Sequence, residues 1–66
     1  TTLMIEVYDA KEEEFVMVNV SKIIIIYHSF DRKSVLIEVD GLNEPIRTSE
    51  SYADVKSKLE GVTNVR

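Results

Sequence analysis

One stretch decides the fold of this chain: Ile23-Ile24-Ile25-Ile26-Tyr27-His28-Ser29-Phe30. The isoleucines branch at Cβ, and two aromatic residues follow them, which favours an extended strand over a helix. Because successive side chains of a strand point to opposite faces, this strand presents apolar side chains on both faces. A strand with one face in water would alternate apolar with polar residues instead. We therefore expect a central strand whose two faces are covered by the rest of the chain or by another molecule.

Shorter strand patterns lie on both sides of this stretch. We expect strands at residues 3–8, 15–20, 23–30, 35–39 and 42–48. The acidic segment 9–14 predicts a solvated connection, with contact to a basic partner as the functional alternative. Asp31-Arg32-Lys33-Ser34 predicts a hairpin turn, and Asp40-Gly41 predicts a type I′ hairpin. Pro45 has no backbone N–H, so the last strand should lie at a sheet edge.

The end of the chain has the pattern of an amphipathic helix over about residues 50–60. Apolar side chains recur at helical spacing at Tyr52, Val55 and Leu59. Ser49 or Ser51 is expected to cap the N-terminus of this helix, and Gly61 its C-terminus. The sequence thus predicts a single α+β domain over residues 1–66, with a four- or five-stranded antiparallel sheet and one C-terminal helix. The alternative is that the sheet curls into a small barrel.

Composition narrows the function. The chain has 66 residues, 8 Lys plus Arg, 12 Asp plus Glu, no Cys and a net charge of −4. A domain this small buries only about 60% of the surface of its unfolded chain, and such domains are often reinforced by disulfides, metals or oligomerisation. The chain has no Cys for disulfides, and its one His cannot form a His-based zinc site alone, so oligomerisation is the remaining way to reinforce the domain. No apolar run reaches the length of a membrane span, and no signal peptide is recognisable, so we expect a cytoplasmic protein.

Residue patterns for catalysis are missing from the sequence. His28 is the single histidine and lies between apolar neighbours, so we expect it to be structural or partly exposed. Gly41 and Gly61 are the only glycines and form no phosphate-binding loop. We therefore predict that the protein is not an enzyme, and we predict no cofactor and no metal site.

The apolar faces of the strands favour a binding function instead. One helix stripe covers one sheet face, which leaves a second apolar face to be covered. We predict a non-enzymatic oligomeric protein-interaction module that uses an apolar sheet face with an acidic rim. A homo-oligomer, a dimer or larger, is expected, and a second protein partner is the further expectation. The predicted interface consists of Ile23, Ile25, Tyr27, Tyr8 and Met17.

A local basic patch supports the alternative function. Arg32, Lys33 and Arg47 are the residues with which a small transcriptional regulator would contact phosphates. The net negative charge disfavours nucleic-acid binding without excluding a local patch. Tyr8, Tyr27 and Tyr52 are candidate interface anchors, and for each of them packing in the core is the favoured interpretation.

The order of these parts resembles the FlbD-like (SwrD-like) small proteins of bacterial flagellar operons. The matching positions are Met4-Ile5, Asn19, Ile23 to Ile26, Asp40-Gly41, and Glu50-Ser51 followed by Val55. The chain differs from that family in its first hairpin, where Lys11-Glu12-Glu13 replaces a glycine turn. The second half also resembles the end of a LytTR-type DNA-binding domain. The resemblance implies a bacterial or phage origin.

Overall fold

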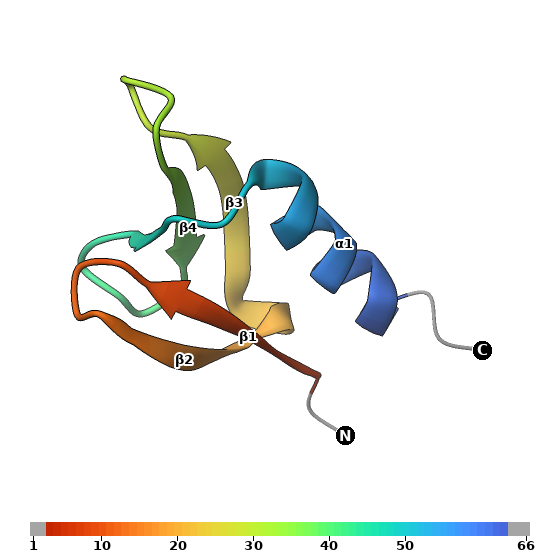
Figure 1. The fold of residues 1–66 in the computed structure, drawn as a ribbon. Helices are drawn as coiled ribbons and strands as arrows, with labels where there is room; N and C mark the ends of the chain where they lie inside the picture. Colours follow the sequence, from red (N-terminus) through yellow and green to blue (C-terminus); the bar gives the residue numbers. More distant parts are fainter. Residues whose placement is uncertain (1–2, 64–66) are drawn as a thin grey trace.

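The structure is a computed structural model that describes residues 3–63, which form an α+β fold (Figure 1). The elements follow in the order β1 (Met4–Asp9), β2 (Glu14–Asn19), the short 3₁₀ helix η1 (Val20–Lys22), β3 (Ile23–His28), β4 (Val35–Val39), β5 (Ile46–Thr48) and α1 (Tyr52–Thr63). The predicted combination of antiparallel strands with a C-terminal helix is confirmed.

The strands form two antiparallel sheets, β1–β2 and β3–β4–β5, so the prediction of a single sheet is wrong. The two sheets touch where the end of β1 meets β5, and the Ala10 N–H donates to the Arg47 carbonyl at 2.8 Å. β5 is three residues long, and Pro45 before it has no N–H to donate. The contact between β1 and β5 is therefore not extended into a ladder of backbone hydrogen bonds. No closed barrel forms within residues 3–63.

β3 lies at the edge of its sheet, so the expectation of a central strand is wrong. Within the described chain it pairs with β4, and its register shifts between Ile23 and Ile25, which inserts one extra residue. The bulge lets Ile23 and Ile26 both pack against the core. Ile24 and Ile25 remain 66% and 49% exposed. The bulge therefore breaks the strict alternation that the sequence pattern implied.

The core lies between the inner faces of the two sheets and α1. Its buried apolar side chains are Ile5, Val7, Val18, Val35, Ile37 and Val55. β1 and β4 contribute at alternate positions, so the inner faces of the two sheets cover one another. The outer faces of both sheets stay in contact with solvent.

α1 is capped where the sequence predicts. The Ser51 hydroxyl accepts the Asp54 N–H at 3.1 Å, which satisfies a free donor of the first turn. Val55 is fully buried, and Leu59 packs against the core. The helix continues through Gly61 to Thr63, so the predicted C-cap at Gly61 is wrong.

The turn after β4 also differs from its prediction. Gly41 has φ +95°, whereas Asp40 keeps a negative φ, and the Leu42 N–H donates to the Val39 carbonyl at 3.1 Å. A positive φ at the second central residue is the pattern of a type II turn, not of type I′. A loop then leads to β5, which begins at Ile46 rather than at Leu42.

The difference in burial between two isoleucines predicts that the same substitution lowers stability by different amounts at the two positions. Ile37 is fully buried, so Ile37→Val should lower the free energy of unfolding by about 0.5–1.5 kcal/mol. Ile24→Val, on the exposed part of β3, should change it by less than about 0.5 kcal/mol. Urea denaturation at low protein concentration measures both. Equal losses at the two positions would contradict this description of the core.

Candidate protein-interaction surfaces

The predicted interface residues lie in three different environments. Ile23 packs against the core and is not available to a partner. Ile25 and Tyr27 lie on β3, in the three-stranded sheet. Tyr8 and Met17 lie on the separate β1–β2 hairpin. The structure therefore divides the predicted interface into two surfaces, which we describe in turn.

The first, the β3 surface, comprises Ile24, Ile25, Tyr27 and Leu36. Tyr27 pairs directly across the ladder with Leu36, and Ile25 pairs with Glu38. The Tyr27 hydroxyl donates to Glu38 Oε2 at 3.3 Å. Partial burial raises the pKa of Tyr27, and the charge and hydrogen bond of the Glu38 carboxylate raise it further. Tyr27 is therefore a neutral, oriented side chain beside two exposed isoleucines.

The second, the hairpin face, comprises Met4, Tyr8, Phe15 and Met17. Ile5 and Val7 point into the core, so their neighbours Met4 and Tyr8 point outward. Phe15 and Met17 are 62% and 57% exposed, and Met4 is 38% exposed. Tyr8 and Phe15 pair across the strands, with ring centroids 5.2 Å apart in an edge-to-face arrangement. The hairpin thus carries apolar side chains along its outer side.

Carboxylates border the hairpin face. Glu6 lies on the face itself, opposite Met17, and Glu12, Glu13 and Glu14 form the adjoining end of the hairpin. In the part of the chain that the structure describes, the ion pairs join Lys11 to Glu44 and Lys58 to Glu50. These four glutamates are therefore not neutralised by an ion pair within residues 3–63. Exposed apolar side chains and carboxylates that form no ion pair in residues 3–63 thus lie next to one another on this hairpin.

Glu50 fixes the hairpin to the helix, a role that sequence reasoning missed. Its carboxylate accepts the Tyr8 backbone N–H at 2.9 Å and also accepts from the Lys58 ammonium group. The same ammonium group donates to the Glu6 carbonyl at 2.7 Å. Glu50 and Tyr8 are 42 positions apart, and no local pattern links them. The sequence indicated only that Glu50 lies near the start of the predicted helix and Lys58 near its end.

The residues of the predicted basic patch lie around one turn. Arg32 and Lys33 are exposed in the turn between β3 and β4, and Arg47 interacts with Asp31 of the same turn. A hollow of about 300 Å³ adjoins this turn, and His28 and Tyr52 line it along with Arg32 and Lys33. His28 stacks on Tyr52 with centroids 5.4 Å apart, so its role here is to join β3 to α1.

Ser29 organises this turn. Its buried hydroxyl donates to Asp31 Oδ1 at 2.6 Å and accepts the Ser34 N–H at 3.1 Å. The Lys33 N–H also donates to Asp31 Oδ1, at 3.0 Å. The hydrogen bond from Ser29 is the largest cause that holds the pKa of Asp31 below its ordinary value, followed by the Lys33 N–H, with a smaller contribution from Arg47. The predicted connection between the two strands is present, but its predicted bounds are wrong: β3 ends at His28, and the Arg32 N–H donates to the Ser29 carbonyl at 2.9 Å, so the turn begins at Ser29 rather than at Asp31.

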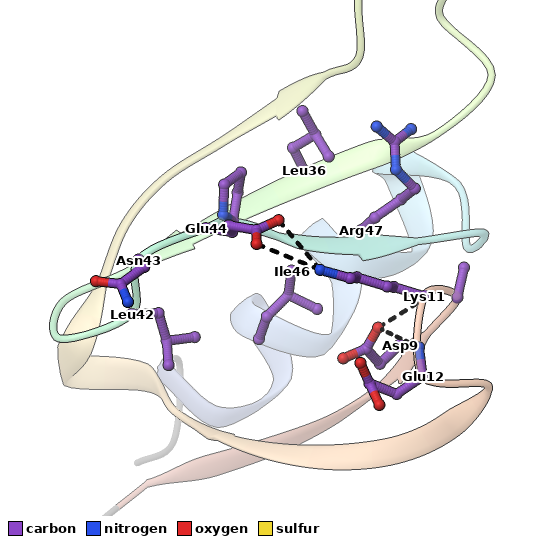
Figure 2. A pocket seen from close by; sticks show the side chains of 11 residues that line it. Asp9, Lys11, Glu12, Leu36, Leu42, Asn43, Glu44, Ile46 and Arg47 are labelled. Carbon is purple, nitrogen blue, oxygen red and sulfur yellow. Dashed lines mark hydrogen bonds and ion pairs between the residues drawn. The ribbon is translucent and has the colours of Figure 1, made fainter.

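Figure 2 shows a groove of about 700 Å³ between the β1–β2 turn and the loop before β5. Leu36, Leu42 and Ile46 are its apolar side chains. Lys11 reaches across to both carboxylate oxygens of Glu44 at 3.3 Å. Asp9 is engaged by the backbone N–H groups of its own turn. Within this groove, the pair of Lys11 with Glu44 therefore holds the two loops together.

Residues 3–63 hold no group of three or more His, Asp or Glu side chains suited to a metal ion. No helix in this range is both long and apolar enough to cross a membrane. Comparison with known protein families, curated proteins and solved structures found no match to this chain. The resemblance to FlbD-like proteins therefore stays a prediction from the sequence.

The hydrogen bond from Ser29 predicts a measurable titration effect. Ser29→Ala removes the largest cause of the lowered pKa of Asp31, so that pKa should rise towards its ordinary value of 3.8. The pKa of Asp31 in the folded protein lies below its ordinary value. The ionised carboxylate therefore stabilises the fold at pH values above the ordinary pKa, and this contribution is lost as the pH falls through the folded-state pKa. NMR titration of the Asp31 carboxyl carbon measures the shift. Ser49→Ala is the control and should leave the titration unchanged.

Proposed function

We propose that this protein is a non-enzymatic protein-interaction module that associates with a second copy of itself through the β3 surface. The observation that carries the proposal is the exposure of Ile24 and Ile25 at an edge strand. Edge strands of natural proteins are commonly protected by charged residues or proline. The β3 segment Ile23–His28 contains neither Asp, Glu, Lys, Arg nor Pro. Within residues 3–63, a bulge near its start and the stacking of Tyr52 on His28 at its end protect this strand.

Charge supports a second copy as the occupant of the β3 surface. In a two-fold dimer the same patch of each subunit meets its counterpart, so a patch that carries charges of one sign repels its copy. The exposed β3 side chains Ile24, Ile25 and Tyr27 bring no formal charge, and their contact removes apolar area from water. The neighbouring Glu38 already accepts a hydrogen bond from Tyr27. Self-association thus gains apolar burial without like-charge contact between the β3 strands.

The proposal predicts the association state of two variants. The wild-type protein should be a dimer or larger at high micromolar concentration, by size-exclusion chromatography with light scattering. Ile25→Asp and Ile24→Lys should each give a folded monomer, because each places a charge in a contact that excludes water. Circular dichroism establishes that the variants stay folded.

The matched control is Met17→Lys, which changes an exposed apolar residue on the hairpin instead of on β3. This variant should remain associated like the wild type. A wild-type protein that is monomeric at high micromolar concentration would refute self-association. If Ile25→Asp unfolds the chain, Ile25 belongs to the core of the monomer and the β3 surface is not an interface.

A second candidate function rests on Arg32 and Lys33, which line the hollow with His28 and Tyr52, and on Arg47, whose charge acts on Asp31 of the same turn. Such an arrangement suits a nucleic-acid-binding regulator that contacts phosphates with its cations. Binding to duplex DNA or to RNA at low salt should then weaken steeply as salt rises, and Arg32→Ala with Lys33→Ala should reduce the slope. Absence of binding at low salt would exclude this function. Bacterial or phage origin and a cytoplasmic location remain predictions from the sequence.

A further inference from the structure

We infer that the hairpin face is a separate docking site for a basic, apolar segment of a different protein. The inference stands on Met4, Tyr8, Phe15, Met17 and their acidic border, and uses no residue of the β3 surface. It holds whether or not the protein associates with itself.

Exposed apolar side chains are the first argument. Scattered exposed apolar residues are common on protein surfaces, but a contiguous patch with a polar rim is typical of an interaction site. On the hairpin, Met17 follows Phe15 on the outward side of β2, and Tyr8 and Met4 lie on the same side of β1. Methionine is flexible and polarisable, which suits it to varied apolar partners. Tyr8 and Phe15 add the large aromatic area that anchors many interfaces.

Charge is the second argument, and it selects the partner. Glu6 lies among these apolar side chains, and Glu12, Glu13 and Glu14 adjoin them, without an ion pair in residues 3–63. A second copy of the hairpin would bring a second set of glutamates to this border, which like-charge repulsion opposes. A segment with lysine or arginine beside its apolar residues would instead complement both features. The charge therefore favours a basic partner over self-association at this face.

Rigidity of the hairpin is the third argument. Glu50 holds the Tyr8 backbone, and Lys58 holds both Glu50 and the Glu6 carbonyl, so the helix fixes β1 from the side of the core. The edge-to-face contact of Tyr8 with Phe15 orients the aromatic part of the face. A surface ordered before binding loses less conformational entropy when the partner docks.

The chain offers a direct probe of this face, because Met4 and Met17 are its only methionines. With methyl-labelled methionine, the NMR spectrum reports on the hairpin face alone. The probe ligand is a synthetic octapeptide of alternating Lys and Leu. Matched octapeptides of alternating Glu and Leu, and of alternating Lys and Ser, separate the contribution of charge from that of apolar contact.

The Lys-Leu peptide should shift both methionine methyl signals, and added salt should weaken its binding because exposed charges are screened. The Glu-Leu and Lys-Ser peptides should bind at least about tenfold more weakly, which corresponds to about 1.4 kcal/mol. A variant that combines Glu12→Gln, Glu13→Gln and Glu14→Gln should lose affinity and salt dependence together. Met17→Thr places another strand-forming residue at this position and should weaken binding of the Lys-Leu peptide about tenfold. The methyl signal of Met4 measures the binding of this variant.

Ile25→Thr is the matched control on the β3 surface and should bind the Lys-Leu peptide like the wild type. The inference is overturned if the peptide leaves both methyl signals in place, if the Glu-Leu peptide binds equally well, or if Ile25→Thr loses as much affinity as Met17→Thr. These outcomes are independent of the light-scattering result for the β3 surface, so the two proposals fail separately.

Discussion

The fold depends on the contact of Val55 with the inner faces of two small sheets. Neither sheet has a second layer of its own, and a two-stranded hairpin is marginally stable alone in water. Val55 is fully buried and belongs to the same cluster as Ile5 and Val7 of β1 and Ile37 of β4. The hydrogen bonds of Glu50 and Lys58 then fix the hairpin beside the helix. The helix therefore stabilises two sheets whose inner faces share one core and whose backbones meet where the end of β1 contacts β5 (Figure 1).

This arrangement explains why the molecule has two exposed apolar surfaces. One helix and two inner faces complete a single core, and the outer faces have no further part of residues 3–63 to cover them. Ile24 and Ile25 remain exposed on one sheet, and Phe15 and Met17 on the other. The small size of the chain makes this unavoidable, since a small domain lacks the material for a third layer.

Local patterns predicted the elements well, and their assembly poorly. Residues 35–39 form the predicted strand, and Ser51 caps the predicted helix, because both depend on neighbours in the sequence. The edge position of β3 depends on which strand pairs with which, and its bulge depends on the register with β4. The contact of Glu50 with the Tyr8 backbone joins positions 42 apart in the sequence, so no local residue spacing predicts it. Of the predicted interface residues, Ile25 and Met17 are exposed, Tyr8 and Tyr27 are half-buried, and their division between two sheets follows from the tertiary structure alone.

The division matters because the two surfaces differ in charge. Partner choice is a difference of free energies, and charge contributes mainly to that difference rather than to the total affinity. The segment Ile23–His28 carries no formally charged side chain at neutral pH, so an identical copy meets no repulsion there. The hairpin face carries Glu6 and adjoins three consecutive glutamates, so an identical copy is disfavoured and a basic segment is favoured. Under the two proposals, the uncharged β3 strand takes a second copy of the chain and the acidic hairpin face takes a basic segment, so the difference in charge separates the two kinds of partner.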